Sequence, residues 1–186
     1  MYKRQLGGLD ALVTNKGGPP EGRFAEVDDG LWLRWFETLV LSYVRAVRAA
    51  LPHLKAAGGG AVVALESTSV KQPIPQLVLS TALRPTVVAL SKALALEHGS
   101  DGVRFNVVLP GSMATERLHD LNRRVAREQG LTEEQALAQR VRDTPLQRLG
   151  EPAELGRVVA FLASPAAAYV TGAVVQVDGG LLRGVY

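Results

Sequence analysis

Cysteine is absent from the 186 residues of this sequence. Its absence excludes disulfide bonds, thiolate nucleophiles and zinc–sulfur sites together, and it is consistent with a reducing compartment. Histidine is scarce as well. His53, His98 and His119 lie in three separate segments without the spacing of metal ligands, so we predict no metal site.

Long apolar runs are also lacking. No stretch of the sequence approaches the roughly 18 uninterrupted apolar residues of a membrane-spanning helix. Residues 1–5 (MYKRQ) lack the apolar core of a signal peptide. We therefore expect a soluble, cytoplasmic protein without a membrane partner.

Charge of one sign does not dominate. The 21 lysines and arginines and 18 acidic residues give a formal net charge of +3. Basic residues cluster only at Arg123, Arg124 and Arg127, a pattern typical of a solvated helix face. Aromatic residues, 5% of the chain, do not interleave with them to stack bases. We expect no nucleic-acid partner.

Short apolar runs and longer segments of helical periodicity alternate along the chain. The runs are continuously apolar, as in strands that are buried on both faces. This pattern predicts one α/β domain over residues 1–186, with a parallel sheet covered by helices on both faces. We expect strands at 9–15, 61–65, 103–109 and 173–177, and helices at 30–56, 77–97 (irregular at Pro85), 115–142 (two stretches broken at Gly130) and 151–163.

Ligands of such sheets bind beyond the carboxyl ends of the strands. The informative loops are therefore those after Asn15, Leu65, Leu109 and Val177. These loops carry motifs that resemble the short-chain dehydrogenase/reductase family. The motifs are Thr14-Asn15-Lys16-Gly17, Asn106 to Gly111 followed by Thr115, and Tyr169 to Gly172 continuing to Val177-Asp178-Gly179-Gly180.

Each motif is weak alone, but they occur in register over residues 7–180. The resemblance implies a partial Rossmann-like doubly wound parallel sheet with only the carboxyl-terminal strands and helices, and NAD or NADP as cofactor. The family opens with a Thr-Gly-x-x-x-Gly-x-Gly turn whose backbone and following helix bind pyrophosphate. That turn is missing here, and Gly58-Gly59-Gly60 cannot replace it because this cluster precedes a strand.

We therefore interpret the chain as an amino-terminally truncated member of the family. Residues 1–5 resemble the translation of a sequencing adapter and are interpreted as a non-native leader. The alternative is a natural helix end. We expect the isolated chain to be inactive, because the phosphate site would be missing, and poorly soluble, because the strand at 9–15 would expose a free edge.

The family's catalytic positions are altered. Ser67 fits the serine position, and counting thirteen residues on leads to Ser80 where the family has tyrosine and to Arg84 where it has lysine. An aliphatic hydroxyl is a far weaker acid than a phenol, and arginine stays protonated. The Ser-x-x-x-Arg pattern resembles a divergent branch of the family. The structural alternatives are a helix-surface serine at Ser80 and a strand-end capping serine at Ser67.

The resemblance also implies cofactor contacts at Asn15, Gly17, Arg84, Pro110, Gly111 and Thr115. Thr115 could equally cap a helix, and Asp178 is expected to order a turn. Lys16 could contact phosphate or point into solvent, and we favour solvent. Leu39 lies where the family has an asparagine that binds water.

Two functions follow. The first is an NAD(P)-dependent oxidoreductase for a small carbonyl or alcohol, similar to a 3-oxoacyl reductase, with residues 112–148 as a substrate lid and a homo-oligomeric (dimeric or tetrameric) parent. The second is a non-catalytic pseudoenzyme or assembly subunit that uses the fold as an interaction surface, as the replaced tyrosine and lysine would allow.

Overall fold

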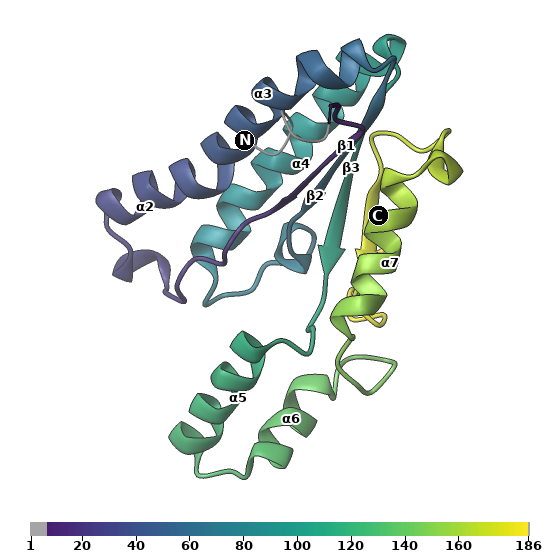
Figure 1. Cartoon of the computed structure of the whole chain (residues 1–186). Coiled ribbons are helices and arrows are strands. Elements are labelled where there is room, and N and C mark those ends of the chain that lie inside the picture. Colours follow the sequence, from purple (N-terminus) through teal and green to yellow (C-terminus); the bar gives the residue numbers. More distant parts are fainter. Residues whose placement is uncertain (1–6, 186) are drawn as a thin grey trace.

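The computed structural model describes residues 7–185. In this part of the chain, four parallel strands form one sheet in the order β1-β2-β3-β4 (Figure 1). The strands are β1 (Ala11–Asn15), β2 (Gly60–Leu65), β3 (Val103–Pro110) and β4 (Val174–Val177). The predicted α/β class and all four predicted strands are confirmed, with ends that differ by at most two residues.

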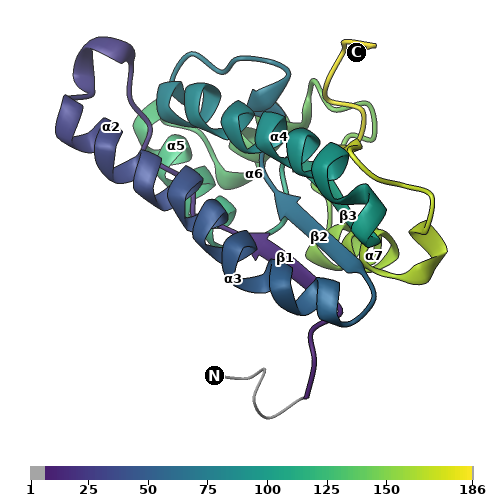
Figure 2. The same cartoon turned by 90° about the horizontal axis from the view of Figure 1, so that it is seen from above.

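Helices cover both faces of the sheet. On one face lie α2 (Asp29–Phe36), α3 (Ser42–Ala56) and α4 (Val78–His98), with α3 and α4 side by side across the strands (Figure 2). On the other face lies α7 (Pro152–Ala163). A hairpin of α5 (Glu116–Gln129) and α6 (Glu133–Val141) projects beyond the carboxyl ends of the strands (Figure 1). Short 3-10 turns occupy Phe24–Glu26, Thr68–Val70, Gly99–Asp101 and Pro165–Ala167.

Local sequence signals account for several helix ends. The Asp28 carboxylate accepts a hydrogen bond from the backbone N–H of Leu31 at 2.7 Å and so caps α2. Gly130 adopts a left-handed conformation after α5, which glycine permits without strain. Pro152 is the first residue of α7, where its missing N–H has no cost.

The apolar strands bury their side chains in two layers. The larger core lies between the sheet and α3–α4 and includes Leu39, Tyr43, Val62 and Phe105, each at most 1% exposed. The smaller core joins Val63, Val108, Leu162 and Ala167 beneath α7. Adjacent side chains of one strand thus enter opposite layers, as expected for strands buried on both faces.

The helix expected over 30–56 is present as α2 and α3, which are joined by a π-helical turn at Glu37–Leu41, where the N–H of Ser42 donates to the carbonyl of Glu37. The irregularity expected at Pro85 is wrong, because α4 continues through this residue. Helix α4 lies against the sheet along its length, and tertiary packing compensates for the hydrogen bond that proline removes.

Helix α4 also bears on the expectation about membranes. With the turn that follows it, Val78–Asp101 is long and apolar enough to cross a bilayer by length and composition alone. In the structure one face of this helix packs on the sheet, with Leu79, Leu83 and Val87 buried.

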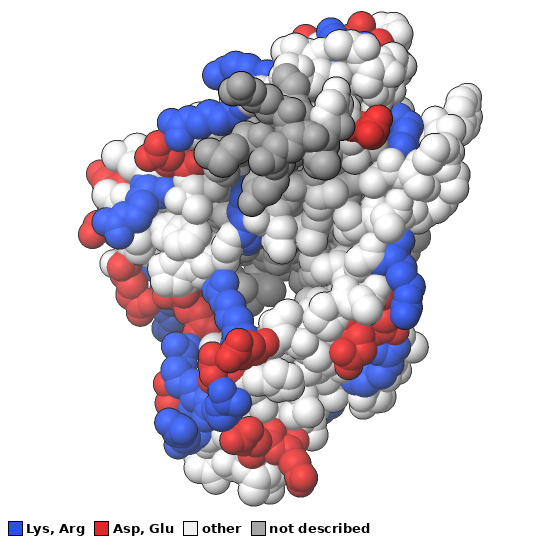
Figure 3. Space-filling model, in the orientation of Figure 1, with Lys and Arg blue, Asp and Glu red and all other residues white. Residues whose placement is uncertain are grey.

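Basic and acidic side chains are intermixed on the visible surface of the α5–α6 hairpin (Figure 3). Arg123 pairs with Asp120, and Arg124 pairs with Glu21 at 2.8 Å and Glu128 at 3.5 Å. The basic cluster singled out in the sequence is therefore largely neutralised by neighbouring carboxylates.

Candidate functional site

The site is built from the loops that follow β1 and β2. Asn15 pairs with Leu65 in the parallel register, so the next residues, Lys16 and Glu66, leave the two strands side by side. Lys16 Nζ lies 2.5 Å from Glu66 Oε1, and the two side chains are only 8% and 0% exposed. The expectation that Lys16 points into solvent is wrong, because a buried carboxylate on the neighbouring strand pairs with it.

Arg84 joins this pair from the second turn of α4. Its NH1 donates to Glu66 Oε2 at 3.0 Å, and its NH2 donates to the carbonyl of Gly17 at 3.1 Å. Its Nε donates to Ser80 Oγ at 3.0 Å, one helical turn earlier. Arg84 is 5% exposed. Its buried guanidinium group links the first turns of α4 to the ends of β1 and β2 by hydrogen bonds.

Ser80 faces the interior. It is 4% exposed, and its hydroxyl lies 3.0 Å from that of Ser69. The alternative of a helix-surface serine is therefore wrong for Ser80. Ser67 instead accepts a hydrogen bond from the backbone N–H of Ser69 at 3.2 Å and caps the turn Thr68–Val70. Among the described residues, the serine that contacts Ser80 is Ser69, which the sequence analysis did not single out.

Burial and charge shift two pKa values here. Burial lowers the pKa of Lys16 from its usual value, Arg84 lowers it further, and Glu66 opposes both effects. Tyr43 lies beneath Lys16, with the ammonium nitrogen 5.1 Å from the ring centroid. Burial raises the pKa of Tyr43 to about 12, Glu66 adds to this shift, and the hydrogen bond to Ser91 opposes it.

The first predicted cofactor segment lies at the end of β1. Asn15 is exposed, and Gly17 contributes its carbonyl to Arg84. Leu39, at the family's asparagine position, is fully buried in the π-helical turn. An apolar side chain at this position cannot bind a water molecule.

The second predicted cofactor segment lies between β3 and β4. Pro110 ends β3, and the N–H of Gly111 donates to the carbonyl of Val177 at 3.0 Å. Asp178 accepts hydrogen bonds from the N–H groups of Gly180 at 3.0 Å and Leu182 at 2.9 Å. The predicted role of Asp178 in ordering a turn is confirmed.

Thr115 caps α5, because its hydroxyl accepts from the N–H of Leu118 at 3.4 Å. Beyond this cap, a cleft of about 650 Å³ separates the α5 helix from the loop after β1. Its lining combines charged and apolar side chains: Pro19, Pro20, Glu21, Leu77, Arg117, Asp120, Leu121 and Arg124. The α5 side of the cleft belongs to the region expected to cover a substrate.

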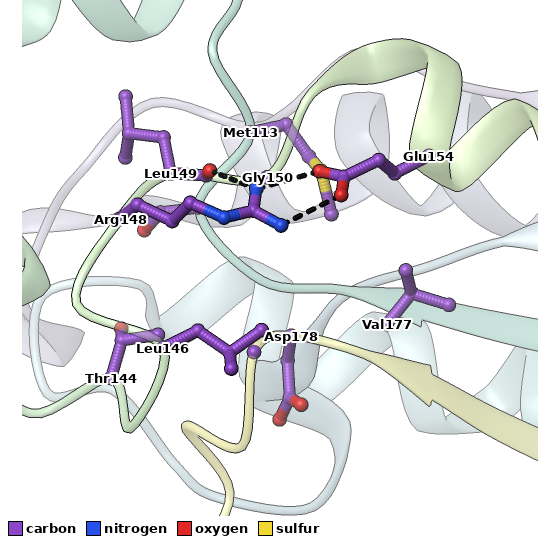
Figure 4. Close-up of a pocket in the computed structure, with 11 residues that line it drawn as sticks. Met113, Thr144, Leu146, Arg148, Leu149, Gly150, Glu154, Val177 and Asp178 are labelled. Atoms are coloured by element: carbon purple, nitrogen blue, oxygen red, sulfur yellow. Dashed lines mark hydrogen bonds and ion pairs between the residues drawn. The ribbon is translucent and has the colours of Figure 1, made fainter.

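A smaller pocket of about 110 Å³ lies where the lid region rejoins the sheet. In Figure 4, Arg148 and Glu154 meet across one side of it, with Arg148 NH1 and NH2 2.8 and 2.7 Å from the carboxylate. Leu146 and Val177 supply apolar walls. The bidentate pair holds the end of the lid region against the start of α7.

Several known proteins resemble this chain. A family model described as enoyl-(acyl carrier protein) reductase matches residues 1–182. L-rhamnose 1-dehydrogenase (NAD(P)(+)) of Azotobacter vinelandii is 36% identical over 181 residues, which cover 95% of this chain and 66% of that protein.

Solved structures superpose closely. L-sorbose reductase from Gluconobacter frateurii, in complex with NADPH and L-sorbose, has a TM-score of 0.94 at 29% identity, over 99% of this chain and 70% of that one. An NADPH-bound short chain oxidoreductase from Pseudomonas aeruginosa PAO1, described as containing an atypical catalytic center, has a TM-score of 0.87 at 36% identity, over 98% and 69%. The chain spans about two thirds of the length of these proteins.

Proposed function

Because the chain belongs to the short-chain dehydrogenase/reductase family, we propose that its protein is an NAD(P)-dependent oxidoreductase acting on a carbonyl or alcohol group of a small molecule. The nicotinamide cofactor, when bound, supplies or accepts the hydride. The observation that carries the proposal is the buried Ser69–Ser80–Arg84–Glu66 network at the carboxyl ends of the strands, where open α/β sheets bind ligands.

The chain's own residues fit the nicotinamide half of such a cofactor. A guanidinium has five N–H donors, and the three bonds that Arg84 makes within residues 7–185 leave two of them to donate to ribose hydroxyls. Gly111 brings the backbone of the β3 loop within reach of a ligand, and Thr115 stands at the start of the lid region. Residues 112–148 would close over the substrate.

Proton supply is the step in which this site departs from a tyrosine–lysine pair. When hydride adds to the carbonyl carbon, the electron pair of the C=O π bond moves to oxygen. Ser69 and Ser80 share one hydrogen bond, so one of the two hydroxyls is left to donate to that oxygen, and the nearby charge of Arg84 stabilises it. Arginine stays protonated and cannot exchange the proton, and a serine hydroxyl is no stronger an acid than water. We therefore propose that the oxygen takes its proton from a water molecule, and that the hydroxide formed leaves to bulk solvent.

The glycine-rich phosphate turn does not occur in this sequence. We therefore propose that the 186-residue chain retains only the nicotinamide half of the nucleotide site and is inactive by itself. NMNH, the reduced mononucleotide, should then bind about as tightly as NADPH, within roughly tenfold or 1.4 kcal/mol. A complete dinucleotide site would favour NADPH far more strongly.

The test is to titrate the chain with NMNH and with NADPH, following nicotinamide fluorescence, and to repeat both titrations with Arg84→Met. We expect weak binding of both ligands and its loss in Arg84→Met. Arg45→Met, which removes an exposed arginine of an ion pair on α3, is the control and should bind like the original chain. Failure of both ligands to bind at millimolar concentration would favour the non-catalytic alternative.

A further inference from the structure

We propose that Lys16 and Glu66 are positioning residues for Arg84, and that together they maintain a net positive charge beneath the substrate oxygen. This inference rests on the proposed function, since it concerns the same site. Nothing in the catalytic pattern of the sequence pointed to either residue. The observation that carries it is one buried carboxylate shared between two buried cations.

The sheet register creates this sharing. Lys16 and Glu66 follow paired strand ends, and the two oxygens of Glu66 take different partners: Oε1 accepts from Lys16 and Oε2 accepts from Arg84. If either cation were lost, one oxygen of a fully buried carboxylate would lose its charged partner. The three groups therefore form one unit.

Glu66 determines how the guanidinium lies. An arginine side chain has several rotatable bonds and loses considerable entropy when it is ordered. Arg84 is held through Nε by Ser80, through NH1 by Glu66 and through NH2 by the Gly17 carbonyl. Partners on three sides define the plane of the group, and Glu66 is the only charged one among them in the described part of the chain. The two remaining N–H groups are thereby aimed in fixed directions.

Charge balance indicates a role in ligand binding. Two cations and one carboxylate leave the unit with a net charge of +1, although all three side chains are at most 8% exposed. Burying an uncompensated charge costs stability. An apolar residue at position 16 would leave a neutral Glu66–Arg84 pair and avoid this cost. The extra charge is useful where an anionic oxygen must be stabilised.

Burial and Arg84 lower the pKa of Lys16, whereas Glu66 favours its charged form. The groups that face Lys16 are Glu66 from the β2 loop, Arg84 from α4 and Tyr43 from α3. Tyr43 stays neutral well above physiological pH and presents its ring face to the ammonium group, an orientation that favours the cation. Among the three groups of the unit, Lys16 is the one whose pKa burial lowers.

The test follows the Arg84 Nε–H signal by NMR in the chain without nucleotide, after assigning it with Arg84→Lys. In Glu66→Gln we expect its exchange with solvent to accelerate at least about tenfold, because a held N–H is protected. Lys16→Met should accelerate this exchange less than Glu66→Gln does. In Lys16→Arg the exchange should be as slow as in the original chain. Glu37→Gln is the matched control, since it removes the carboxylate of the exposed Arg45–Glu37 pair. Unchanged exchange in Glu66→Gln would overturn the positioning role.

A measurement on the unsubstituted chain covers the case in which Glu66→Gln fails to fold. Raising the pH should shift the Lys16 side-chain signal and the Arg84 Nε–H signal with one common midpoint. An Arg84 Nε–H signal that does not shift while Lys16 titrates would contradict the proposal. Neither readout needs nucleotide, so a failed oxidoreductase proposal leaves them unaffected. Folded Glu66→Gln should also bind NMNH at least about tenfold more weakly, and equal affinity would refute the link to the ligand.

Discussion

Gly111 and Asp178 bring two strand ends into backbone contact. A Cβ atom built on Gly111 would lie 2.7 Å from the Cα of Asp178, which is closer than two non-bonded carbon atoms can approach. The N–H of Gly111 donates to the carbonyl of Val177, directly before Asp178. The end of β3 therefore lies against the end of β4 without room for any side chain, and the shape of this side of the ligand site depends on glycine.

Gly111→Ala should destabilise the fold by about 1–3 kcal/mol. The new methyl group would clash with the backbone of Asp178, which cannot move aside as easily as a flexible side chain. Gly17→Ala is the matched control from the other predicted cofactor loop, since a Cβ there would meet nothing within 4 Å. We expect it to change stability by less than about 0.5 kcal/mol. Urea denaturation of both variants measures the difference, and equal losses would contradict the role assigned to Gly111.

Glu66→Gln should be strongly destabilising. It leaves Lys16 and Arg84, at 8% and 6% side-chain exposure, without their shared counter-charge. Breaking a buried ion pair from one side typically costs about 3–5 kcal/mol. Glu37→Gln breaks a pair whose side chains are about 60% exposed and should cost less than about 1 kcal/mol. Denaturation midpoints compare the two, and a similar small loss for both would show that the buried unit contributes little to stability.

Lys16 should make stability depend on pH. Its folded-state pKa is lowered, mainly by burial, so the unfolded chain binds more protons between that lowered value and 10.5. The free energy of unfolding therefore rises with pH in this window. Lys16→Met should remove the rise. Urea denaturation in steps from neutral pH to about pH 10 tests this, and parallel pH profiles for both proteins would contradict it.

Tyr43 should produce the opposite slope at higher pH. Its hydroxyl lies 2.7 Å from that of Ser91 in the core, and burial raises its pKa to about 12. The unfolded chain loses this proton near pH 10, so the fold loses stability as the pH rises above 10. The absorbance of ionised tyrosine should show a late step near pH 12 that Tyr43→Phe abolishes. Persistence of that step in the variant would assign it to another tyrosine.

Local signals were sufficient for the elements of the fold. The continuous apolar runs that became β2 and β3 predicted strands buried on both faces, because only helices on both sides of a sheet can cover such runs. Asp28, Gly130 and Pro152 marked helix ends through interactions within a few residues. The turn at Asp178 was predictable for the same reason, since its partners are two and four residues away.

Other features depend on residues that are distant in sequence. The π-helical turn at Glu37–Leu41 and the continuous helix through Pro85 reflect packing on the sheet, which local preferences do not report. The choice of Ser69 over Ser67 as the partner of Ser80 depends on how the turn Thr68–Val70 orients two nearby hydroxyls. Counting residues along the chain cannot distinguish them.

The sequence by itself determined the alternation of strands and helices, the carboxyl edge of the sheet as the place of the site, and the positions of Ser80 and Arg84 on one face of a helix. Only the tertiary structure decided that Lys16 turns inward. Its partner Glu66 lies 50 residues away, and the two meet because parallel pairing aligns Asn15 with Leu65. A lysine alone in a loop favours water, whereas a lysine beside a buried carboxylate is held by charge.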